Sequence, residues 1–250
     1  MAASAPPWKL WLRRIAGHSN PARRLICFPH AGAGASAFHP LAEHLPAEIE
    51  LWAVQYPARE DRSSEAAPTD LIAMAGEVGY ALQWLRDLPY AFFGHSMGAI
   101  VAYEAARRLP KLGIDLPVRL FASACAAPNV FALESMPTGR VEDLMRHLGR
   151  GVSLLDDPEA RRMLVSTVQN DLRMIGRYVL AEDGRLACPI TACIGVADLE
   201  VRHVQAVEWN RFTTGSFELE KFDGDHFYLL DRPAEVCSMI ARHLDRDAVS

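Results

Sequence analysis

Short runs of consecutive apolar residues alternate along this chain with longer stretches in which apolar residues recur every three or four positions. The short runs have the length of buried strands. We expect strands at 24–28, 51–56, 90–93, 118–125, 189–194 and 217–222. Continuous apolar strands are typical of parallel sheets that are covered on both faces. The pattern therefore predicts an α/β fold built on a mostly parallel, doubly wound sheet.

Helical periodicity fills the gaps between these strands. The stretch 70–86 carries apolar residues at helical spacing, and Asp70 is a good N-cap for it. The stretch 97–109 is apolar and rich in alanine, and 234–244 begins directly after Pro233, a favourable first residue of a helix. Strands and helices therefore alternate, as a doubly wound sheet requires.

One region interrupts this alternation. The stretch 128–187 contains helical patterns at 141–148 and 158–180 but no convincing strand. It is longer than an ordinary crossover, and we expect it to be a helical lid over a site; ordinary crossover helices are the alternative. No repeat or long linker divides the chain, so we treat 1–250 as a single domain that contains this insertion.

Composition excludes several classes of protein. The chain has 250 residues, of which 50% are hydrophobic, and a net charge of −5. Disorder and nucleic-acid binding are not expected from these values. We expect no membrane span and no signal peptide, because no apolar run is long enough. The five cysteines form no CxxC pair, which favours buried free thiols in a cytoplasmic protein.

The most informative motif is a Gly-x-Ser-x-Gly sequence centred on Ser96. It stands between the apolar run 90–93 and the helical stretch 97–109. A sharp turn between a strand and a helix exposes a serine above the sheet, and Gly94 and Gly98 leave room for the backbone to pass. The motif predicts that Ser96 is a nucleophile.

A serine nucleophile needs a base and an acid that orients this base. His226 follows the last expected strand directly, at the edge of the sheet where sites form, and we expect it to be the base. Asp198 follows the strand 189–194 and is the expected acid; Glu200, two residues further on, is the alternative. His95 is interpreted as a packed structural histidine.

An oxyanion hole needs two backbone donors. We expect one to be the amide of Met97, the residue after the nucleophile. The other should come from the loop that follows the first expected strand, where the sequence 28–34 is rich in glycine and alanine. This loop has neither the spacing of a dinucleotide-binding motif nor a Walker lysine, so a phosphate-binding role is rejected.

With these residues in place, the chain resembles a type II thioesterase, an editing enzyme of polyketide and non-ribosomal peptide synthesis. The resemblance covers nearly the whole chain after about residue 23. The motifs that carry it are Phe28-Pro-His-Ala-Gly-Ala-Gly, Tyr56-Pro-Ala-Arg-Glu-Asp-Arg, Gly94-His-Ser-Met-Gly, Asp198 and Gly224-Asp-His-Phe. It implies an α/β-hydrolase fold with a helical lid.

The resemblance also implies an activity and a set of roles. The enzyme would remove acyl groups from the phosphopantetheine arm of acyl or peptidyl carrier proteins, with no metal or other cofactor. Nothing in the sequence requires more than a monomer. Ser96 would be the nucleophile, His226 the base and Asp198 the acid, and the amides of Met97 and Ala31 would form the oxyanion hole. The family often has proline after the acid, whereas leucine stands there in this sequence.

Two arginines of the second motif are left open. Arg59 and Arg62 follow a strand end, where they are expected either to meet an acidic carrier or its phosphate, or to pair internally with Glu60 or Asp61. Alternatives for the function are a carboxylesterase or acyl-CoA thioesterase, an acyltransferase, and a non-catalytic scaffold that binds a ligand or carrier.

Overall fold

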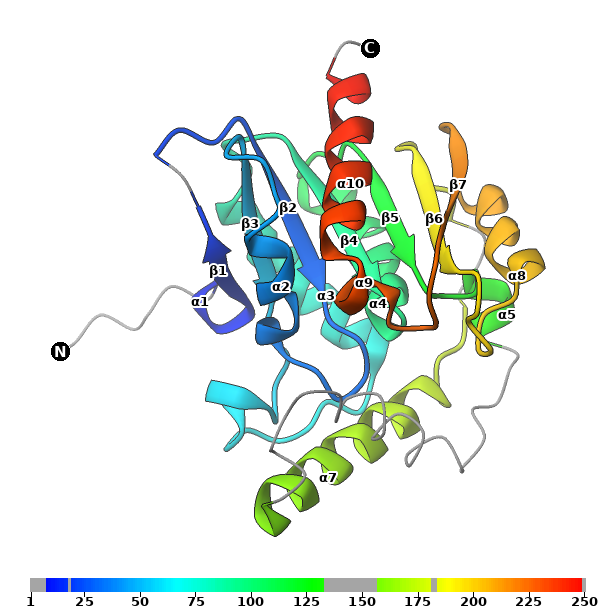
Figure 1. Ribbon diagram of the computed structural model, residues 1–250. Helices are drawn as coiled ribbons and strands as arrows, with labels where there is room; N and C mark the ends of the chain where they lie inside the picture. Colours follow the sequence, from blue (N-terminus) through cyan, green and yellow to red (C-terminus); the bar gives the residue numbers. More distant parts are fainter. Residues whose placement is uncertain (1–7, 18, 133–156, 181–183, 249–250) are drawn as a thin grey trace, which may run out of the picture.

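The computed structural model describes residues 8–17, 19–132, 157–180 and 184–248 (Figure 1). Within these ranges, strands form one sheet in the order β1-β3-β2-β4-β5-β6-β7. The strands are β1 Leu12–Ala16, β2 Arg23–Phe28, β3 Ile49–Val54, β4 Tyr90–His95, β5 Leu120–Ser123, β6 Ile190–Gly195 and β7 Phe217–Phe222. All neighbouring strands are parallel except β1, which runs antiparallel to β3.

The six predicted strands are therefore confirmed, with shifted ends. The largest shifts are two residues at each end: the predicted stretch 118–125 shortens to β5 Leu120–Ser123, and the predicted stretch 51–56 moves to β3 Ile49–Val54. The edge strand β1 was not predicted, because Arg13 and Arg14 interrupt its apolar positions and only Leu12 is buried. An edge strand needs no continuous apolar run, since one of its sides remains open to solvent.

Helices cover both faces of the sheet (Figure 1). On one face lie α3 (Leu71–Ala81) and α4 (Met97–Ala106); α10 (Pro233–Asp247) and α2 (His39–Ala42) lie on the other. Asp70 caps α3 as predicted, because its carboxylate accepts hydrogen bonds from the amides of Ile72 and Ala73. The shorter helices are α1 (Trp8–Trp11), α5 (Pro128–Phe131), α8 (His203–Val207) and α9 (Tyr228–Asp231).

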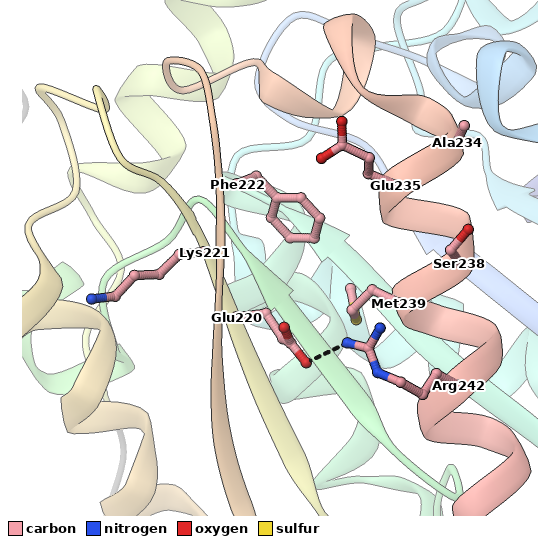
Figure 2. A pocket seen from close by; sticks show the side chains of 8 residues that line it. All are labelled: Glu220, Lys221, Phe222, Ala234, Glu235, Ser238, Met239 and Arg242. Carbon is pink, nitrogen blue, oxygen red and sulfur yellow. Dashed lines mark hydrogen bonds and ion pairs between the residues drawn. The ribbon is translucent and has the colours of Figure 1, made fainter.

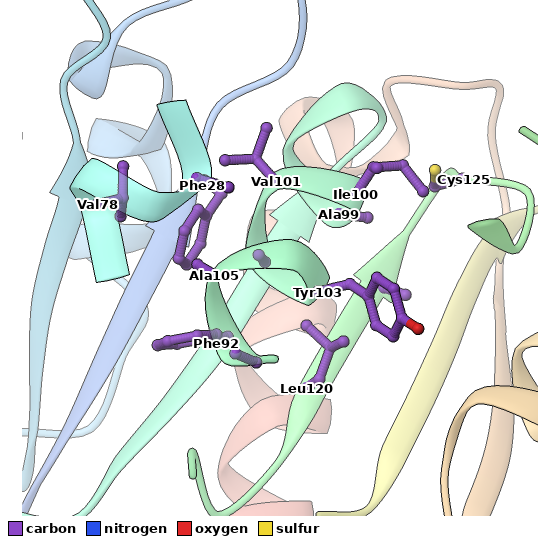
Figure 3. Packing of buried hydrophobic residues seen from close by; sticks show 14 of the residues in the cluster. Phe28, Val78, Phe92, Ala99, Ile100, Val101, Tyr103, Ala105, Leu120 and Cys125 are labelled. Atoms are coloured by element: carbon purple, nitrogen blue, oxygen red, sulfur yellow. The ribbon is translucent and has the colours of Figure 1, made fainter. Parts of the chain in front are cut away.

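Each face of the sheet has its own hydrophobic cluster. Beneath α3 and α4, residues such as Phe28, Phe92 and Leu120 from the strands meet Val78 and Ile100 from the helices (Figure 3). The second cluster joins the other side chains of the strands to α2 and α10. The five cysteines are free and buried, as predicted. Burial of both faces explains why the strands are continuously apolar.

The predicted insertion is only partly within the described residues. Helix α7 (Pro158–Ile175) is confirmed, although it ends earlier than the predicted stretch 158–180. The predicted helix at 141–148 lies outside the described residues. Helix α7 lies beyond the ends of the strand arrows, over the carboxyl edge of the sheet (Figure 1). Its role as a lid stays a prediction. Within the described ranges, the structure contains no helix with the length and apolar character of a bilayer span.

Candidate active site

Ser96 stands at the turn between β4 and α4. Its backbone has φ 53° and ψ −122°, a conformation that non-glycine residues rarely adopt. Its amide donates to the carbonyl of Ser123, 2.8 Å away, which ties the turn to β5. Within residues 90–106, all of which the structure describes, Ser96 alone is not buried. The chain thus places a strained serine at the one accessible position of an otherwise buried segment.

Two glycines make this turn possible. A Cβ atom on Gly94 would lie 2.4 Å from the Cα of Ala99, and one on Gly98 would lie 2.0 Å from the carbonyl oxygen of Phe28. Both distances are shorter than any real contact of this kind. The close approach of Gly98 to Phe28 also places the end of β2 directly beside the first turn of α4. The loop after β2 therefore starts next to Ser96.

His226 and Asp198 form a hydrogen-bonded pair after two other strands. His226 Nδ1 lies 2.9 Å from Asp198 Oδ2, and both side chains are buried. The other carboxylate oxygen of Asp198 accepts from the amides of Glu200 and Val201, at 2.7 and 3.1 Å. Gly195 permits the contact between the two loops, because a Cβ atom there would lie 2.2 Å from the carbonyl oxygen of Asp225. The structure thus brings together the predicted base and the predicted acid.

The surroundings of Asp198 favour its charged form. Burial by itself raises the pKa of a carboxyl group, but the hydrogen bond from His226, the charge of that ring and the two amides outweigh this effect. The pKa of Asp198 is therefore lowered from its ordinary value. An ionised carboxylate at Nδ1 keeps the proton on that nitrogen and leaves Nε2 as the basic atom.

The alternative acid, Glu200, lies on the other side of the ring. Its Oε2 atom is 3.7 Å from Nε2 of His226, whereas Asp198 contacts Nδ1. Asp225, in the histidine loop, accepts from the amide of Phe227 at 2.9 Å. The geometry favours Asp198 as the orienting acid, because it makes a short hydrogen bond to Nδ1 of His226, whereas Glu200 lies beside Nε2, the atom that a base must use.

Two further histidines pack around His226 inside the site. His95 is fully buried; its ring centroid lies 5.4 Å from that of His226 and 5.5 Å from that of His30. His95 Nδ1 lies 2.9 Å from the hydroxyl of Ser123, which itself lies 2.6 Å from the hydroxyl of Tyr228. The prediction that His95 is a packed histidine is therefore confirmed. His30 could not be predicted as part of the site, because only the fold brings this loop residue beside the ring of His95.

Burial keeps these two histidines neutral. The pKa of His30 is lowered to about 3 by desolvation, with smaller effects of His226 and Arg59. The pKa of His95 is also lowered well below its ordinary value, for the same main reason and by the neighbouring histidines. Neutral rings beside His226 add no positive charge that would oppose protonation of the base.

The loop after β2 forms a tight turn beside the N-terminus of α4. The amide of Ala33 donates to the carbonyl of His30, 3.1 Å away, and Gly32 has φ +82°. A positive φ at the third position of such a turn is typical of type II, which favours glycine there. Ala31, the expected oxyanion donor, is the other central residue. This loop starts where the end of β2 contacts Gly98 at the carbonyl of Phe28. Met97, the residue before Gly98, therefore lies near the start of the loop.

The two arginines of the second motif are internal. Arg59 forms a bidentate ion pair with Asp171 of α7, at 2.7 and 2.8 Å, with both side chains almost fully buried. Arg62 pairs with Glu65 at 2.7 and 2.6 Å. Neither arginine has the partner that the sequence analysis named, Glu60 or Asp61. Arg59 pairs with Asp171 because the fold brings α7 over the loop that follows β3.

Two pockets differ in their relation to this site. A pocket of about 550 Å³ lies between α7 and the loop after β2; His30 and Gly32 line it together with Leu164 of α7 and Leu230 of α9. A second pocket of about 380 Å³ lies between β7 and α10, where Arg242 and Glu220 are joined at 2.8 Å (Figure 2). Only the first pocket borders the proposed oxyanion loop.

Comparison with known proteins places these features in a family. A family model described as "Thioesterase domain" matches residues 23–244. The chain is 37% identical over 241 residues to the probable cadicidin biosynthesis thioesterase of Streptomyces griseus, covering 95% of this chain and 66% of that protein. It is 34% identical over 240 residues to thioesterase PikA5 of Streptomyces venezuelae, covering 94% of this chain and 85% of that protein.

A solved structure agrees with these matches. The type II thioesterase BorB from the borrelidin biosynthetic cluster matches with a TM-score of 0.79 and 35% identity, covering 94% of this chain and 97% of that chain. The predicted α/β-hydrolase fold is thereby confirmed. The family match and these similarities span almost the whole length of the chain, including every residue of the site described above. The chain belongs to the thioesterase family and, within it, to the type II thioesterases.

Proposed function

We propose that this enzyme hydrolyses aberrant or stalled acyl groups from the phosphopantetheine arm of acyl or peptidyl carrier proteins in polyketide or non-ribosomal peptide biosynthesis. Its similarity to thioesterases of antibiotic biosynthesis supports this substrate class. The observation that carries the chemistry is Ser96 in its strained turn, on the same sheet edge as the hydrogen-bonded pair of His226 and Asp198.

The proposed mechanism is a two-step acyl transfer. The Ser96 hydroxyl attacks the thioester carbonyl while His226 Nε2 accepts its proton, and the amides of Met97 and Ala31 stabilise the oxyanion. The tetrahedral intermediate collapses, and the phosphopantetheine thiol leaves with the proton that His226 returns. Water, activated by His226, then attacks the acyl-serine ester and releases the free acid and Ser96. Asp198 orients His226 throughout.

The pocket beside the oxyanion loop supports a site for the acyl group or for the end of the pantetheine arm. It borders Gly32, next to the proposed oxyanion donor, and residues of α7 form its other wall. Leu164 and Leu230 give it an apolar part, as a short acyl chain requires. We therefore place α7 in the substrate-binding part of the enzyme.

The test is hydrolysis of a propionyl group from a phosphopantetheinylated carrier protein, with propionyl-CoA as the second substrate. Wild type and Ser96→Ala are compared under the same conditions. We expect carrier hydrolysis to exceed acyl-CoA hydrolysis and to fall by up to about a millionfold in Ser96→Ala. Substantial turnover in this variant would refute the serine mechanism.

The same experiment separates the alternatives. Equal or better use of propionyl-CoA would keep the serine chemistry but assign the enzyme to the general thioesterases. Transfer of the propionyl group to an added alcohol or amine instead of water would indicate an acyltransferase. Carrier binding without any turnover by the wild type would indicate a scaffold.

A further inference from the structure

The loop that is proposed to stabilise the oxyanion is held by a carboxylate of a distant helix. Asp171, about one turn before the C-terminal end of α7, accepts a hydrogen bond from the amide of Gly32 at 2.8 Å through Oδ2. The same carboxylate forms the bidentate ion pair with Arg59. Arg59 in turn donates to the carbonyl of Ala33 at 3.1 Å. The pair therefore contacts two successive residues of the turn, one through an N–H and one through a C=O.

These two contacts determine the orientation of the turn. In a four-residue turn, types I and II differ mainly in the direction of the central peptide group, here between Ala31 and Gly32. The N–H of this peptide points to Asp171, which stabilises the orientation that the positive φ of Gly32 requires. Loss of this acceptor permits the peptide to rotate. Such a rotation changes ψ of Ala31, and with it the path of the turn next to the Ala31 amide, the proposed oxyanion donor.

The strength of the arrangement follows from its burial. The side chains of Arg59 and Asp171 are only 4% and 1% exposed. Charge-assisted hydrogen bonds are stronger than neutral ones, and water does not compete for these groups. The pair joins two segments that are distant in the sequence, since 112 residues separate Arg59 from Asp171. A buried ion pair contributes little net stability compared with apolar residues of similar size, so its geometry is its more specific contribution.

We propose that Asp171 and Arg59 are positioning residues that couple the position of α7 to the formation of the oxyanion hole. The inference rests on the proposed function, because it takes the amide of Ala31 as an oxyanion donor. When α7 is seated on the loop, Asp171 and Arg59 hold the turn in the competent conformation. Displacement of α7 removes both contacts and the hole with them. The enzyme then stabilises the transition state only when α7 covers the loop.

The test replaces the ion pair with apolar residues of similar size. In the double variant Arg59→Met/Asp171→Leu neither side chain is left charged and unpaired, so we expect the fold to be retained. We expect kcat for propionyl-carrier hydrolysis to fall by about 100-fold with KM unchanged, because the lost interaction acts in the transition state. The affinity for an alkylboronic acid, which forms an anionic tetrahedral adduct with serine, should fall by the same factor.

Two further variants keep the result specific. The matched control, Arg62→Met/Glu65→Leu, removes a bidentate pair from the same segment and should retain the wild-type kcat and boronic acid affinity. The variant Arg59→Met/Asp171→Asn retains an oxygen that can accept from Gly32 and should recover part of the lost kcat. If the first double variant does not fold, Arg59→Lys takes its place, because lysine keeps the charge but does not reproduce the fork-shaped contacts.

The possible outcomes separate this inference from the proposed function. A kcat equal to that of the control would overturn the positioning role, as would a higher KM at unchanged kcat or a kcat loss without weaker boronic acid binding. Each of these leaves the serine mechanism intact, provided that Ser96→Ala is inactive. Turnover by Ser96→Ala would instead refute the mechanism itself.

Discussion

The two halves of the site are held in different ways. Ser96, Asp198 and His226 follow the ends of β4, β6 and β7, and hydrogen bonds and close glycine contacts at the sheet edge set their positions. The proposed oxyanion loop, in contrast, depends on a charged side chain of α7 that is 139 residues away from Gly32 in the sequence. The sheet therefore fixes the proposed nucleophile and its proposed base, whereas the loop proposed to stabilise the transition state depends on a separate element.

The sharpest test of the half of the site at the sheet edge, formed by Ser96, Asp198 and His226, is the replacement Asp198→Asn. Loss of the carboxylate removes the hydrogen bond that orients His226, and we expect kcat to fall by about 10⁴-fold, equivalent to about 5.5 kcal/mol in the barrier. The matched variant Glu200→Gln should retain most of the activity. Steady-state hydrolysis of the propionyl-carrier substrate measures both. The reverse order of the two effects would assign the orienting role to Glu200.

The backbone of the nucleophile turn is broken by Gly98→Ala. The added Cβ would lie 2.0 Å from the Phe28 carbonyl oxygen, so β2 and α4 must separate. We expect a loss of more than about 4 kcal/mol in the free energy of unfolding, in the range of the most severe single substitutions. Gly76→Ala is the control, because the nearest atom there is 3.5 Å away and alanine favours a helix. Denaturant unfolding that finds the two variants equally stable would contradict this packing.

The substitution Gln55→Leu should destabilise the other half of the site, the proposed oxyanion loop after β2. Gln55 accepts from the amide of Ala35 at 2.8 Å and donates to the carbonyl of Arg59 at 3.0 Å, so it joins the two segments that Asp171 contacts. Leaving both backbone groups unpaired should cost about 2 kcal/mol of stability. Gln83→Leu, at an exposed position, should change the free energy of unfolding by less than about 0.5 kcal/mol. Equal effects in urea unfolding would show that Gln55 does not hold the loop.

The last expected effect concerns the dependence of stability on pH. His30 has a pKa of about 3 in the folded protein, whereas an unfolded histidine titrates near 6.5. Below pH of about 6.5 the unfolded state binds more protons, so the stability falls as the pH is lowered towards 3, by up to about 1.4 kcal/mol per pH unit from this group. His30→Phe should reduce this slope while keeping the aromatic contacts. An unchanged slope in denaturant unfolding between pH 6.5 and 4 would disprove the buried neutral state of His30.

The positions of Ser96, Asp198 and His226 were predicted well from the sequence, because the patterns that identify them are local. Continuous apolar runs identified six strands, and the glycines around Ser96 predicted the turn that the structure contains. The order of the chain placed Asp198 and His226 after later strands, and the structure joins them at 2.9 Å. The catalytic roles of these residues stay predictions, but their positions follow from patterns within a few residues of each.

The contacts that hold the loop were not predictable in the same way. Arg59 was expected to pair with a near neighbour or a carrier, whereas it pairs with Asp171. No local pattern identifies Asp171, because it lies among other polar residues on an amphipathic helix, and only the tertiary fold brings it to Gly32. The edge strand β1 was missed for a related reason: Arg13 and Arg14 interrupt its apolar positions, and its pairing with β3 is a property of the assembled sheet.

The central claim is that Ser96 is the acylated nucleophile. The most direct measurement is mass spectrometry of the protein after reaction with a fluorophosphonate, followed by peptide mapping of the adduct. We expect a single adduct on the peptide that contains Ser96, and none in Ser96→Ala. An unlabelled wild-type protein, or an adduct on another residue that persists in Ser96→Ala, would contradict it.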